Sequence, residues 1–434
     1  MRYLFVRVRY DKRVASMEPL GLEYLLAAVK KEGRKGYIFD EGLYSSIGRY
    51  RRLSEVIKLK KIDFVGFSVM SSSAEIVLDL IKKLRRDFPK LLIMVGGPEV
   101  MLNYRDFLLP EIDFVSYDNG IESFRAAVKG NFAPEVMANL PGHAFKWNRT
   151  WVVNEKGSPV CGYSLRPDRT LFYRNKDKYK VIAKGTFALA KSTFSCPQKC
   201  KFCVSRHFND CTYAERDPED FVDELMNLDN DKVFIIDDDF LVNKKRVIKI
   251  CNLLNERGCD KTFMVFARAD SIMKCEDIMP LLYKSGFRDM LVGLEAVEDE
   301  TLIKYNKNSS VECNRRAIDI LRKNNMLCVG LFVVNYDFKH KDFRNINRFI
   351  RKEGIIWVLF SILIPFKGTP VYEENKDRLY KYKYRRTDGT HVLMKTTGMS
   401  RLMFLLEYNL LYIRNYPRIY LAGLTGKFDR KYKK

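Results

Sequence analysis

Cys196, Cys200 and Cys203 form a Cys-x3-Cys-x2-Cys cluster that follows the largely apolar segment 185–194. A short loop with this spacing can turn all three sulfur atoms toward one metal centre. Thiolates prefer soft metals, so the centre could be zinc, copper(I) or an iron–sulfur cluster, whereas hard cations are disfavoured. The cysteines alone do not separate these possibilities, so the neighbouring residues and elements must be considered with them.

Zinc and iron–sulfur clusters make different demands on the protein. A structural zinc site takes four protein ligands, and His207 or Cys211 could provide the fourth. Neither stands at the paired spacing of a zinc knuckle, and a zinc loop does not need a strand before it. A [4Fe–4S] cluster ordinarily takes four cysteines, so a cluster with three keeps one iron open for a substrate or cofactor. A zinc-stabilised, basic nucleic-acid-binding protein is therefore the alternative from another functional class.

Length and charge set broad limits. At 434 residues the chain is longer than one typical core, which predicts two or three domains. Its 77 Lys and Arg residues against 54 Asp and Glu residues give a net charge of +23. This balance favours an anionic partner such as a phosphate, a nucleic acid or an acidic membrane surface. A merely lysine-rich composition explains the charge equally well, so charge alone does not choose a partner.

The sequence also indicates where the protein works. Residues 1–9 begin a strand pattern and carry no signal peptide, and no uncharged run reaches the roughly 18 residues of a membrane span. The chain has ten cysteines that cluster at one place only, which argues against a disulfide framework. We therefore expect a cytoplasmic protein without a transmembrane segment, present as a monomer or weak oligomer.

Residues 1–130 alternate between apolar strands and amphipathic helices. Continuous apolar strands of this kind predict an α/β domain with a Rossmann-like parallel sheet that helices cover on both faces. Ligands of such sheets bind at the carboxyl ends of the strands. The strand patterns lie at 4–8, 37–39, 64–70, 91–95 and 112–115, and the clearest helical patterns at 20–29 and 72–84.

The second half of the chain repeats this alternation. Residues 131–184 lose regularity and are expected to form a linker, whereas residues 185–370 contain six strand–helix units, which predict a partial (β/α)6 barrel of TIM type. The cysteine loop, residues 195–203, follows the first strand, at the end of the barrel where active sites lie. Residues 371–434 are expected to form a small, mainly helical cap. The expected strands are 185–191, 232–236, 262–267, 289–295, 327–334 and 357–364, and the cap contains a helix at 401–412 and a frayed tail at 427–434.

The cysteine loop resembles the signature of the radical S-adenosylmethionine (SAM) superfamily, in which an aromatic residue precedes the last cysteine as Phe202 does. The resemblance implies that Cys196, Cys200 and Cys203 hold a [4Fe–4S] cluster whose open iron binds the amino and carboxylate groups of SAM. Reductive cleavage of SAM then yields methionine and a 5′-deoxyadenosyl radical. An external electron donor such as flavodoxin or ferredoxin is expected as a partner.

Polar residues after successive barrel strands agree with this resemblance. Asp237 and Asp238 follow the second predicted strand, where the family places groups near the methionine end of SAM, and Arg268 follows the third. Glu295 ends the fourth strand, and the matching Glu in the family generally accepts hydrogen bonds from the ribose hydroxyls. Together with Phe202, these four residues are the expected SAM contacts.

A parallel sheet placed before such a barrel resembles the cobalamin-binding class of this superfamily. Two features depart from the pattern of that class. No Asp-x-His-x-x-Gly motif occurs, and the domain taken as residues 1–130 has no histidine to offer to cobalt, which is a common absence in this class. The frequent Gly-Glu-Gly-Glu of the class also reads Tyr-Asp-Asn-Gly-Ile-Glu at 117–122. The resemblance implies cobalamin contacts from residues at the strand and helix ends, namely Gly21, Ser68, Ser71, Gly96, Gly97 and Pro98.

The expected reaction is methyl transfer from methylcobalamin to a carbon that no side chain can deprotonate. Segments 331–338 and 390–396 resemble cobalamin-dependent radical C-methylases that act on polycyclic lipids and natural products. We therefore expect a small-molecule, lipid or natural-product substrate, anionic or neutral, and His391 is a candidate to reach its cavity. Dehydration, oxidation or rearrangement without methyl transfer is the alternative within the same family.

Overall fold

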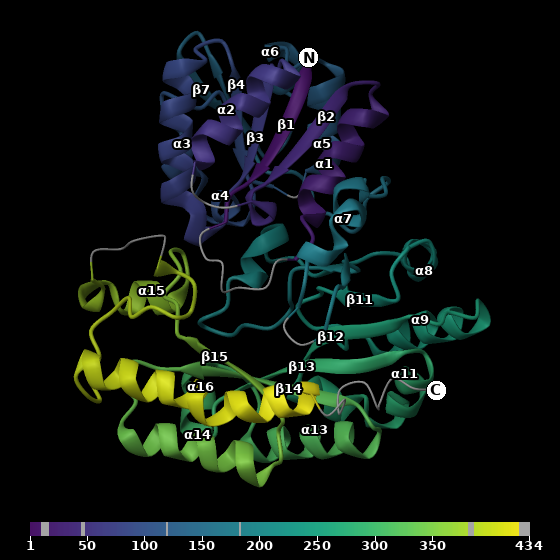
Figure 1. Cartoon of the computed structure of the whole chain (residues 1–434), viewed down its shortest axis with the longest axis vertical. Helices are drawn as coiled ribbons and strands as arrows, with labels where there is room; N and C mark the ends of the chain where they lie inside the picture. Colours follow the sequence, from purple (N-terminus) through teal and green to yellow (C-terminus); the bar gives the residue numbers. More distant parts are fainter. Residues whose placement is uncertain (10–16, 45–47, 119, 182–183, 381–385, 425–434) are drawn as a thin grey trace. The chain divides into compact units, whose positions relative to one another are not determined.

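The computed structural model of the chain describes residues 1–434 except 10–16, 45–47, 119, 182–183, 381–385 and 425–434 (Figure 1). The chain divides into two compact units. The first unit contains residues 1–180 and 207–214, and the second contains residues 181–206, 215–382 and 386–434. Each unit has its own sheet, and each is described by itself.

The first unit is built on a seven-stranded sheet in the order β2-β1-β3-β4-β5-β6-β7. The first five strands are parallel, as predicted, and helices connect them. Figure 1 shows α2 and α3 on one face of this sheet and α1 and α5 on the other. The strands are β1 (Arg2–Arg7), β2 (Lys35–Asp40), β3 (Phe64–Ser68), β4 (Leu92–Gly96), β5 (Phe114–Ser116), β6 (His143–Trp147) and β7 (Thr150–Val153), and the main helices are α1 (Leu20–Lys31), α2 (Arg49–Lys60), α3 (Ala74–Asp87), α4 (Pro98–Asn103) and α5 (Ile121–Lys129).

Apolar side chains on both faces of the strands explain why this sheet is parallel and covered. Leu4 and Val6 of β1 are fully buried against the apolar faces of α2 and α3. Aromatic rings fill the opposite face, where Phe64 and Phe132 have ring centroids 4.7 Å apart. Burial on both faces favours parallel strands with helical crossovers, and it places all the β-to-α turns at one edge of the sheet.

The boundary predicted at residue 130 is too early for this sheet. β6 and β7 form a hairpin that pairs antiparallel with β5, so the sheet runs on to residue 153. The two residues of the turn, Asn148 and Arg149, both have positive φ angles, as tight two-residue hairpin turns require. The hairpin was missed because β7 is only half-buried and its residues do not alternate cleanly between apolar and polar.

The second unit contains the predicted partial barrel. Its six strands follow one another in the order β15-β14-β13-β12-β11-β8, every neighbouring pair is parallel, and β8 and β15 are the two edges, so the barrel is open. The strands are β8 (Ala188–Ala190), β11 (Lys232–Ile235), β12 (Thr262–Arg268), β13 (Phe287–Glu295), β14 (Leu327–Val334) and β15 (Trp357–Ile362), and the main helices are α8 (Pro218–Met226), α9 (Lys244–Glu256), α10 (Ala269–Lys274), α11 (Met279–Lys284), α12 (Asp299–Lys304), α13 (Val311–Lys323) and α14 (His340–Lys352).

The C-terminal region of this unit packs on the last strand of the barrel. It contains two α-helices, α15 (Pro370–Glu374) and α16 (Arg401–Leu424), and α16 lies along α14 and β15 (Figure 1). Tyr408 and Tyr412 of α16 donate hydrogen bonds to the backbone oxygen of Phe360, at 3.1 and 2.6 Å. The helix is about twice as long as predicted, and the tail predicted at 427–434 lies outside the described residues.

Within the described part of the chain, no helix has both the length and the hydropathy that a bilayer-crossing segment needs.

Candidate functional site

The three cysteines of the signature line one cavity at the carboxyl ends of the barrel strands. Cys200 is buried, and Cys196 and Cys203 are half-buried. The cavity has a volume of about 120 Å³. Its other lining residues are Gln198, Phe202, Ser205, Arg206, Asp238, Phe266, Ala267, Arg268, Leu291, Gly293, Glu295, Lys307 and Leu331.

This donor set fits an iron–sulfur cluster better than a single zinc ion. The described residues that line the cavity include no histidine and no fourth cysteine, so the zinc ligands proposed at His207 and Cys211 do not complete the set there. Among the described residues, no three His, Cys, Asp or Glu side chains are close enough to hold one metal ion. Each cysteine of a [4Fe–4S] cluster binds a different iron, which requires sulfur atoms farther apart than those around a single ion.

The cavity disfavours free thiolates, so the positive charge of a metal would have to stabilise them. Burial raises the pKa of Cys196 to about 12, and burial also raises the pKa of Cys203. A bound cation reverses this effect because thiolates are its ligands. One protein cation already stands beside the cluster position: Nη1 of Arg268 lies 3.3 Å from Sγ of Cys200.

The segment 305–307, between α12 and α13, holds the cysteine loop through hydrogen bonds and a ring contact. The backbone oxygen of Tyr305 accepts a hydrogen bond from Lys201 N at 3.0 Å, and the amide of Asn306 donates to Lys199 O at 2.9 Å. The ring of Tyr305 also meets the ring of Phe202 edge to face, with centroids 5.2 Å apart. Sequence reasoning missed this segment because its residues carry no motif and act partly through their backbone.

The three consecutive aspartates after β11 have three different surroundings. Asp238 lines the cavity, as a SAM contact should. Asp237 does not: its buried carboxylate accepts hydrogen bonds from Ser192 N at 2.6 Å and from Thr193 N at 2.9 Å, so the expectation of a SAM contact there is corrected. Burial raises the pKa of Asp237, and these hydrogen bonds oppose the rise.

The third aspartate, Asp239, holds the backbone at Arg268 in place by hydrogen bonds. Its carboxylate accepts hydrogen bonds from Ser271 Oγ at 2.6 Å and from the backbone N of Arg268 at 3.4 Å. Burial raises the pKa of Asp239 to about 6. The guanidinium of Arg268 is held further by Asp270 at 2.8 Å and by the backbone oxygen of Lys307. Arg268 is therefore fixed in place beside the cysteines.

Glu295 ends β13 at the wall of the cavity and pairs with a lysine that the sequence analysis did not single out. Nζ of Lys307 lies 2.7 Å from Oε1 of Glu295, and both residues are buried. Glu295 has a φ of 60°, in the left-handed region, where the register with β14 shifts. A non-glycine residue in this region stores strain of roughly 1–3 kcal/mol, which is typical of functional sites.

A second cavity of about 360 Å³ adjoins the first, because the two share Phe202, Glu295 and Leu331. Glu295 and Ser361 are its polar lining residues, and the rest are apolar. Its walls come mainly from β14, β15 and the segment after β15, and the β14 residues belong to the segment 331–338 that resembles the C-methylases. The remaining lining residues are Phe332, Val333, Leu359, Phe360, Leu363, Ile364 and Phe366.

His391 lies near this second cavity without lining it. Its Nδ1 is 2.9 Å from the carboxylate oxygens of Asp388, which holds the ring. The neighbouring Gly389 accepts a hydrogen bond from Ile362 N at 2.6 Å, and a Cβ on this glycine would lie 2.4 Å from Ser361 Oγ. The chain around His391 therefore packs tightly over the end of β15, and the predicted reach into the cavity stays a prediction.

In the first unit, the residues predicted to contact cobalamin gather at one edge of the sheet. Ser68 and Gly96 end β3 and β4 and are paired in register. Gly97 has a φ of 99°, and a Cβ there would lie 2.9 Å from Val69 N, so a larger residue would clash. Pro98 begins α4. The turn after β4 therefore requires a glycine, and it lies at the edge where parallel sheets bind their ligands.

Ser71 and Gly21 complete the predicted set. The hydroxyl of Ser71 donates a hydrogen bond to Glu99, which also accepts one from Asn103 at 2.6 Å. Gly21 lies in the first turn of α1, and a Cβ added there would meet nothing within 4 Å. The hydroxyls, the tight glycine and the open space are chemically compatible with a large polar ligand such as cobalamin.

Residues 1–130 contain no histidine, as expected, but the sheet of the first unit continues beyond them and includes His143 at the start of β6. The ring is fully buried, and its Nδ1 lies 2.8 Å from the backbone oxygen of Pro141. Its Nε2 has no hydrogen-bond partner among the described residues. Burial lowers the pKa of His143, so the ring is neutral at ordinary pH.

Comparison with family models finds two matches along the chain. Residues 6–128 match the B12 binding domain, and residues 191–350 match the radical SAM superfamily. These two domains imply cobalamin, SAM and a [4Fe–4S] cluster as cofactors. The match at residues 191–350 includes the cysteine loop, so it argues against the zinc-binding alternative.

Three similar proteins indicate the range of reactions in this group. The anaerobic magnesium-protoporphyrin IX monomethyl ester cyclase of Cereibacter sphaeroides is 25% identical over 92% of this chain and 68% of its own length. The hopanoid C-3 methylase of Methylococcus capsulatus is 24% identical over 89% of this chain and 74% of its own length. The bacteriochlorophyllide d C-8(2)-methyltransferase of Chlorobaculum tepidum is 28% identical over 52% of each protein.

Solved structures share the whole architecture. The cobalamin-dependent SAM radical enzyme OxsB, with aqua-cobalamin and SAM bound, has a TM-score of 0.75 and 13% identity, covering 96% of this chain and 67% of its own. The radical SAM methyltransferase TsrM from Kitasatospora setae, with tryptophan and a SAM analogue bound, has a TM-score of 0.70 and 15% identity, covering 96% and 89%. At these identities the likeness establishes the fold.

Replacing Cys200 with serine should abolish iron binding after anaerobic reconstitution with iron and sulfide, because the hydroxyl cannot replace a thiolate ligand. The measurement is the iron and sulfide content of the desalted protein. The matched control, Cys211→Ser, should keep the full iron content. Iron retained by the Cys200 variant, or zinc bound in its place by the unmodified protein, would contradict this assignment.

Replacing Asp237 with alanine should lower the free energy of unfolding by roughly 2–4 kcal/mol, because two buried backbone N–H groups lose their acceptor. Asp237→Asn should lose much less, since an amide oxygen can still accept these bonds and its NH₂ can donate to the hydroxyl of Ser192. Urea unfolding of both variants gives the comparison. Equal stabilities for the two variants would show that the carboxylate does not hold the start of the cysteine loop.

Proposed function

Because this chain belongs to the cobalamin-binding radical SAM enzymes, we propose that it transfers a methyl group to an unactivated carbon of an apolar substrate. The observation that carries this proposal is the adjacency of two cavities in the barrel. The cysteine cavity and the apolar cavity share Phe202, Glu295 and Leu331 as common walls. A radical formed in the first would therefore be close to a carbon held in the second.

The bound cofactors supply the electron that cleaves SAM and the methyl group that is transferred. In this proposal the chain contributes the cluster ligands Cys196, Cys200 and Cys203, and it orients SAM. Glu295 accepts hydrogen bonds from the ribose hydroxyls, as an ionised carboxylate can. Lys307 balances the charge of this buried carboxylate. Asp238 and Arg268, which line the cavity with the cysteines, would lie near the methionine end of SAM.

The composition of the second cavity supports an apolar substrate. Leu, Phe, Val and Ile side chains form most of the cavity wall. Such a wall stabilises a bound hydrophobic molecule, with a free-energy gain of about 25 cal/mol for each Å² of apolar surface removed from water. Ser361 and Glu295 are left to orient it by hydrogen bonds. Two relatives are named for action on hopanoid and on bacteriochlorophyllide d, and a comparable polycyclic lipid or natural product would suit these walls.

The proposal also includes the cellular setting. A reduced flavodoxin or ferredoxin would supply the electron, and the cytoplasm would keep the ten cysteines reduced. At the carboxyl edge of the first sheet, Gly21, Ser68, Ser71 and the Gly96–Pro98 turn are the residues we assign to cobalamin. The enzyme would act as a monomer or weak oligomer.

A second candidate function is a radical oxidation or ring closure without methyl transfer. The relative that favours it is a cyclase, which aligns with 92% of this chain. In that case the same residues would bind SAM and substrate, and the product would lack the new methyl group. The two candidates therefore differ in the fate of the methyl group of SAM.

Anaerobic turnover with SAM carrying a labelled methyl group should transfer the label to a compound in a total lipid extract of the source cells. S-adenosylhomocysteine and 5′-deoxyadenosine should form together, because one SAM provides the methyl group and another the radical. Mass spectrometry of the extract and of the nucleosides provides the measurement. Formation of 5′-deoxyadenosine with neither S-adenosylhomocysteine nor labelled product would support the second candidate and exclude the first.

Replacing Glu295 with glutamine should weaken SAM binding about tenfold, the effect of losing hydrogen bonds to a charged acceptor. Equilibrium dialysis of SAM against the cluster-loaded protein measures this change. Glu298→Gln is the matched control, because this nearby carboxylate bonds Asn345 and does not line the cavity. An unchanged affinity in the Glu295 variant would remove this residue from the SAM site.

A further inference from the structure

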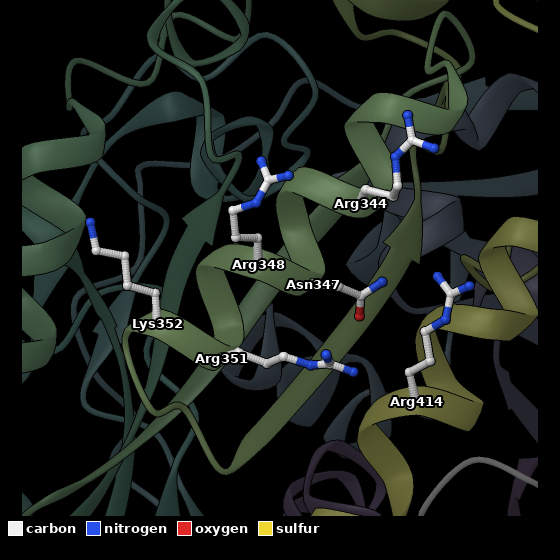
Figure 2. A pocket seen from close by; sticks show the side chains of 6 residues that line it. All are labelled: Arg344, Asn347, Arg348, Arg351, Lys352 and Arg414. Atoms are coloured by element: carbon white, nitrogen blue, oxygen red, sulfur yellow. The ribbon is translucent and has the colours of Figure 1, made fainter.

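A groove of about 660 Å³ lies between α14 and α16, on the outer side of the barrel, and basic side chains line it. Figure 2 shows Arg351 of α14 and Arg414 of α16 reaching into the space between the two helices. Asn347 lies at the floor, where it accepts a hydrogen bond from Asn415 at 2.9 Å. The remaining lining residues are Arg344, Arg348 and Lys352, so the described residues that line the groove include no carboxylate.

The charges of this groove are poorly compensated. No ion pair with a described residue is formed by Arg344, Arg348, Arg351 or Lys352. Glu407 is the neighbouring acid, and it is already paired with His340 at 2.7 Å and is 3.9 Å from Arg414. Like charges held this close repel one another, so an anion that enters the groove is stabilised.

An apolar stripe runs along the outer face of α16, beside the groove. It consists of Leu402, Leu406, Ile413 and Tyr416, which are 78, 50, 65 and 53% exposed. Their spacing of four, seven and three residues places them on one side of the helix. The opposite side of α16 is the buried one, formed by Phe404, Tyr408 and Leu411.

The position of the stripe is what distinguishes the possible partners. A surface helix normally presents a polar outer face, whereas α16 is apolar on both sides. Ile413 directly precedes Arg414, so the stripe adjoins the wall that α16 contributes to the groove. Nucleic acid or an acidic soluble protein would use the positive charges and leave the stripe in water. A lipid surface would use both.

We propose that α14 and α16 form a docking surface for a membrane that contains anionic phospholipids. The groove residues Arg344, Arg348, Arg351 and Arg414 bind the phosphates of the headgroups, and the stripe enters the boundary between headgroups and acyl chains. Interfacial helices bind in this way, through buried apolar area together with attraction to anionic lipid. Docking does not depend on the proposed methyl transfer, but it places the enzyme at the phase in which an apolar substrate dissolves.

The charged part of the surface can be tested by co-sedimentation with lipid vesicles. The full chain should bind vesicles of phosphatidylcholine with phosphatidylglycerol and should bind pure phosphatidylcholine much more weakly. Binding should fall as salt is raised from about 0.05 to about 0.5 M, because screening weakens attraction to the headgroups. Salt-independent binding, or equal binding to both kinds of vesicle, would overturn the role of the groove.

Substitution separates the groove from the overall charge of +23. The variant with Arg344→Gln, Arg348→Gln and Arg351→Gln should bind anionic vesicles at least tenfold more weakly, since each basic residue near the surface contributes about fivefold. A control with Lys82→Gln, Lys83→Gln and Lys90→Gln removes three exposed charges from the first unit and should change binding little. Equal losses in the two variants would overturn the proposal.

The apolar part of the surface requires its own variant. Leu406→Ser with Ile413→Ser should also weaken vesicle binding, whereas Leu59→Ser with Ile303→Ser, at exposed sites elsewhere, should not. Circular dichroism and iron content should match the unmodified protein in every variant, because all these side chains are exposed. The binding of a short DNA duplex provides the last comparison. The membrane proposal fails if the groove variant loses affinity for both vesicles and DNA while the stripe variant keeps its affinity for vesicles. The groove would then be a site for soluble anions.

Discussion

The buried carboxylate of Asp237 determines where the cysteine loop leaves the barrel, and the rest of the site depends on that position. It accepts hydrogen bonds from the backbone N of Ser192 and Thr193, which joins the end of β11 to the chain that follows β8. The backbone oxygen of Ser192 in turn accepts bonds from Arg216 N at 2.9 Å and from Arg246 Nη2 at 3.2 Å. A fixed starting point allows only a few directions for the loop, so three thiols can face one cavity before any metal arrives.

Strand order explains why residues far apart in the sequence meet in this cavity. The carboxyl ends of six consecutive parallel strands lie at one end of the barrel, so Asp238, Arg268 and Glu295 reach the cysteines from three successive strands. This much follows from the sequence, because apolar strands, helical spacing and the cysteine motif are all local patterns. The partial barrel, the covered parallel sheet and the gathering of these residues around the cysteines were therefore predictable.

Other parts of the site have no local pattern and were not predictable. Asp237 and Asp238 are neighbours of the same type, and only their packing makes one a support for the backbone and the other a lining residue. Lys307 contributes a buried partner to Glu295 from an irregular segment with no motif. The apolar cavity is formed by side chains that look like ordinary core residues in the sequence. The hairpin of β6 and β7 was likewise hidden by its half-buried, irregular pattern.

The central claim is that one chain holds both an iron–sulfur cluster and cobalamin. The most direct test is anaerobic reconstitution of the full chain with iron, sulfide and hydroxocobalamin, followed by desalting and measurement of iron, sulfide and corrin absorbance in the protein fraction. The account predicts that a [4Fe–4S] cluster and one corrin remain with each chain. Zinc in place of iron, or corrin that separates completely from the protein, would contradict it.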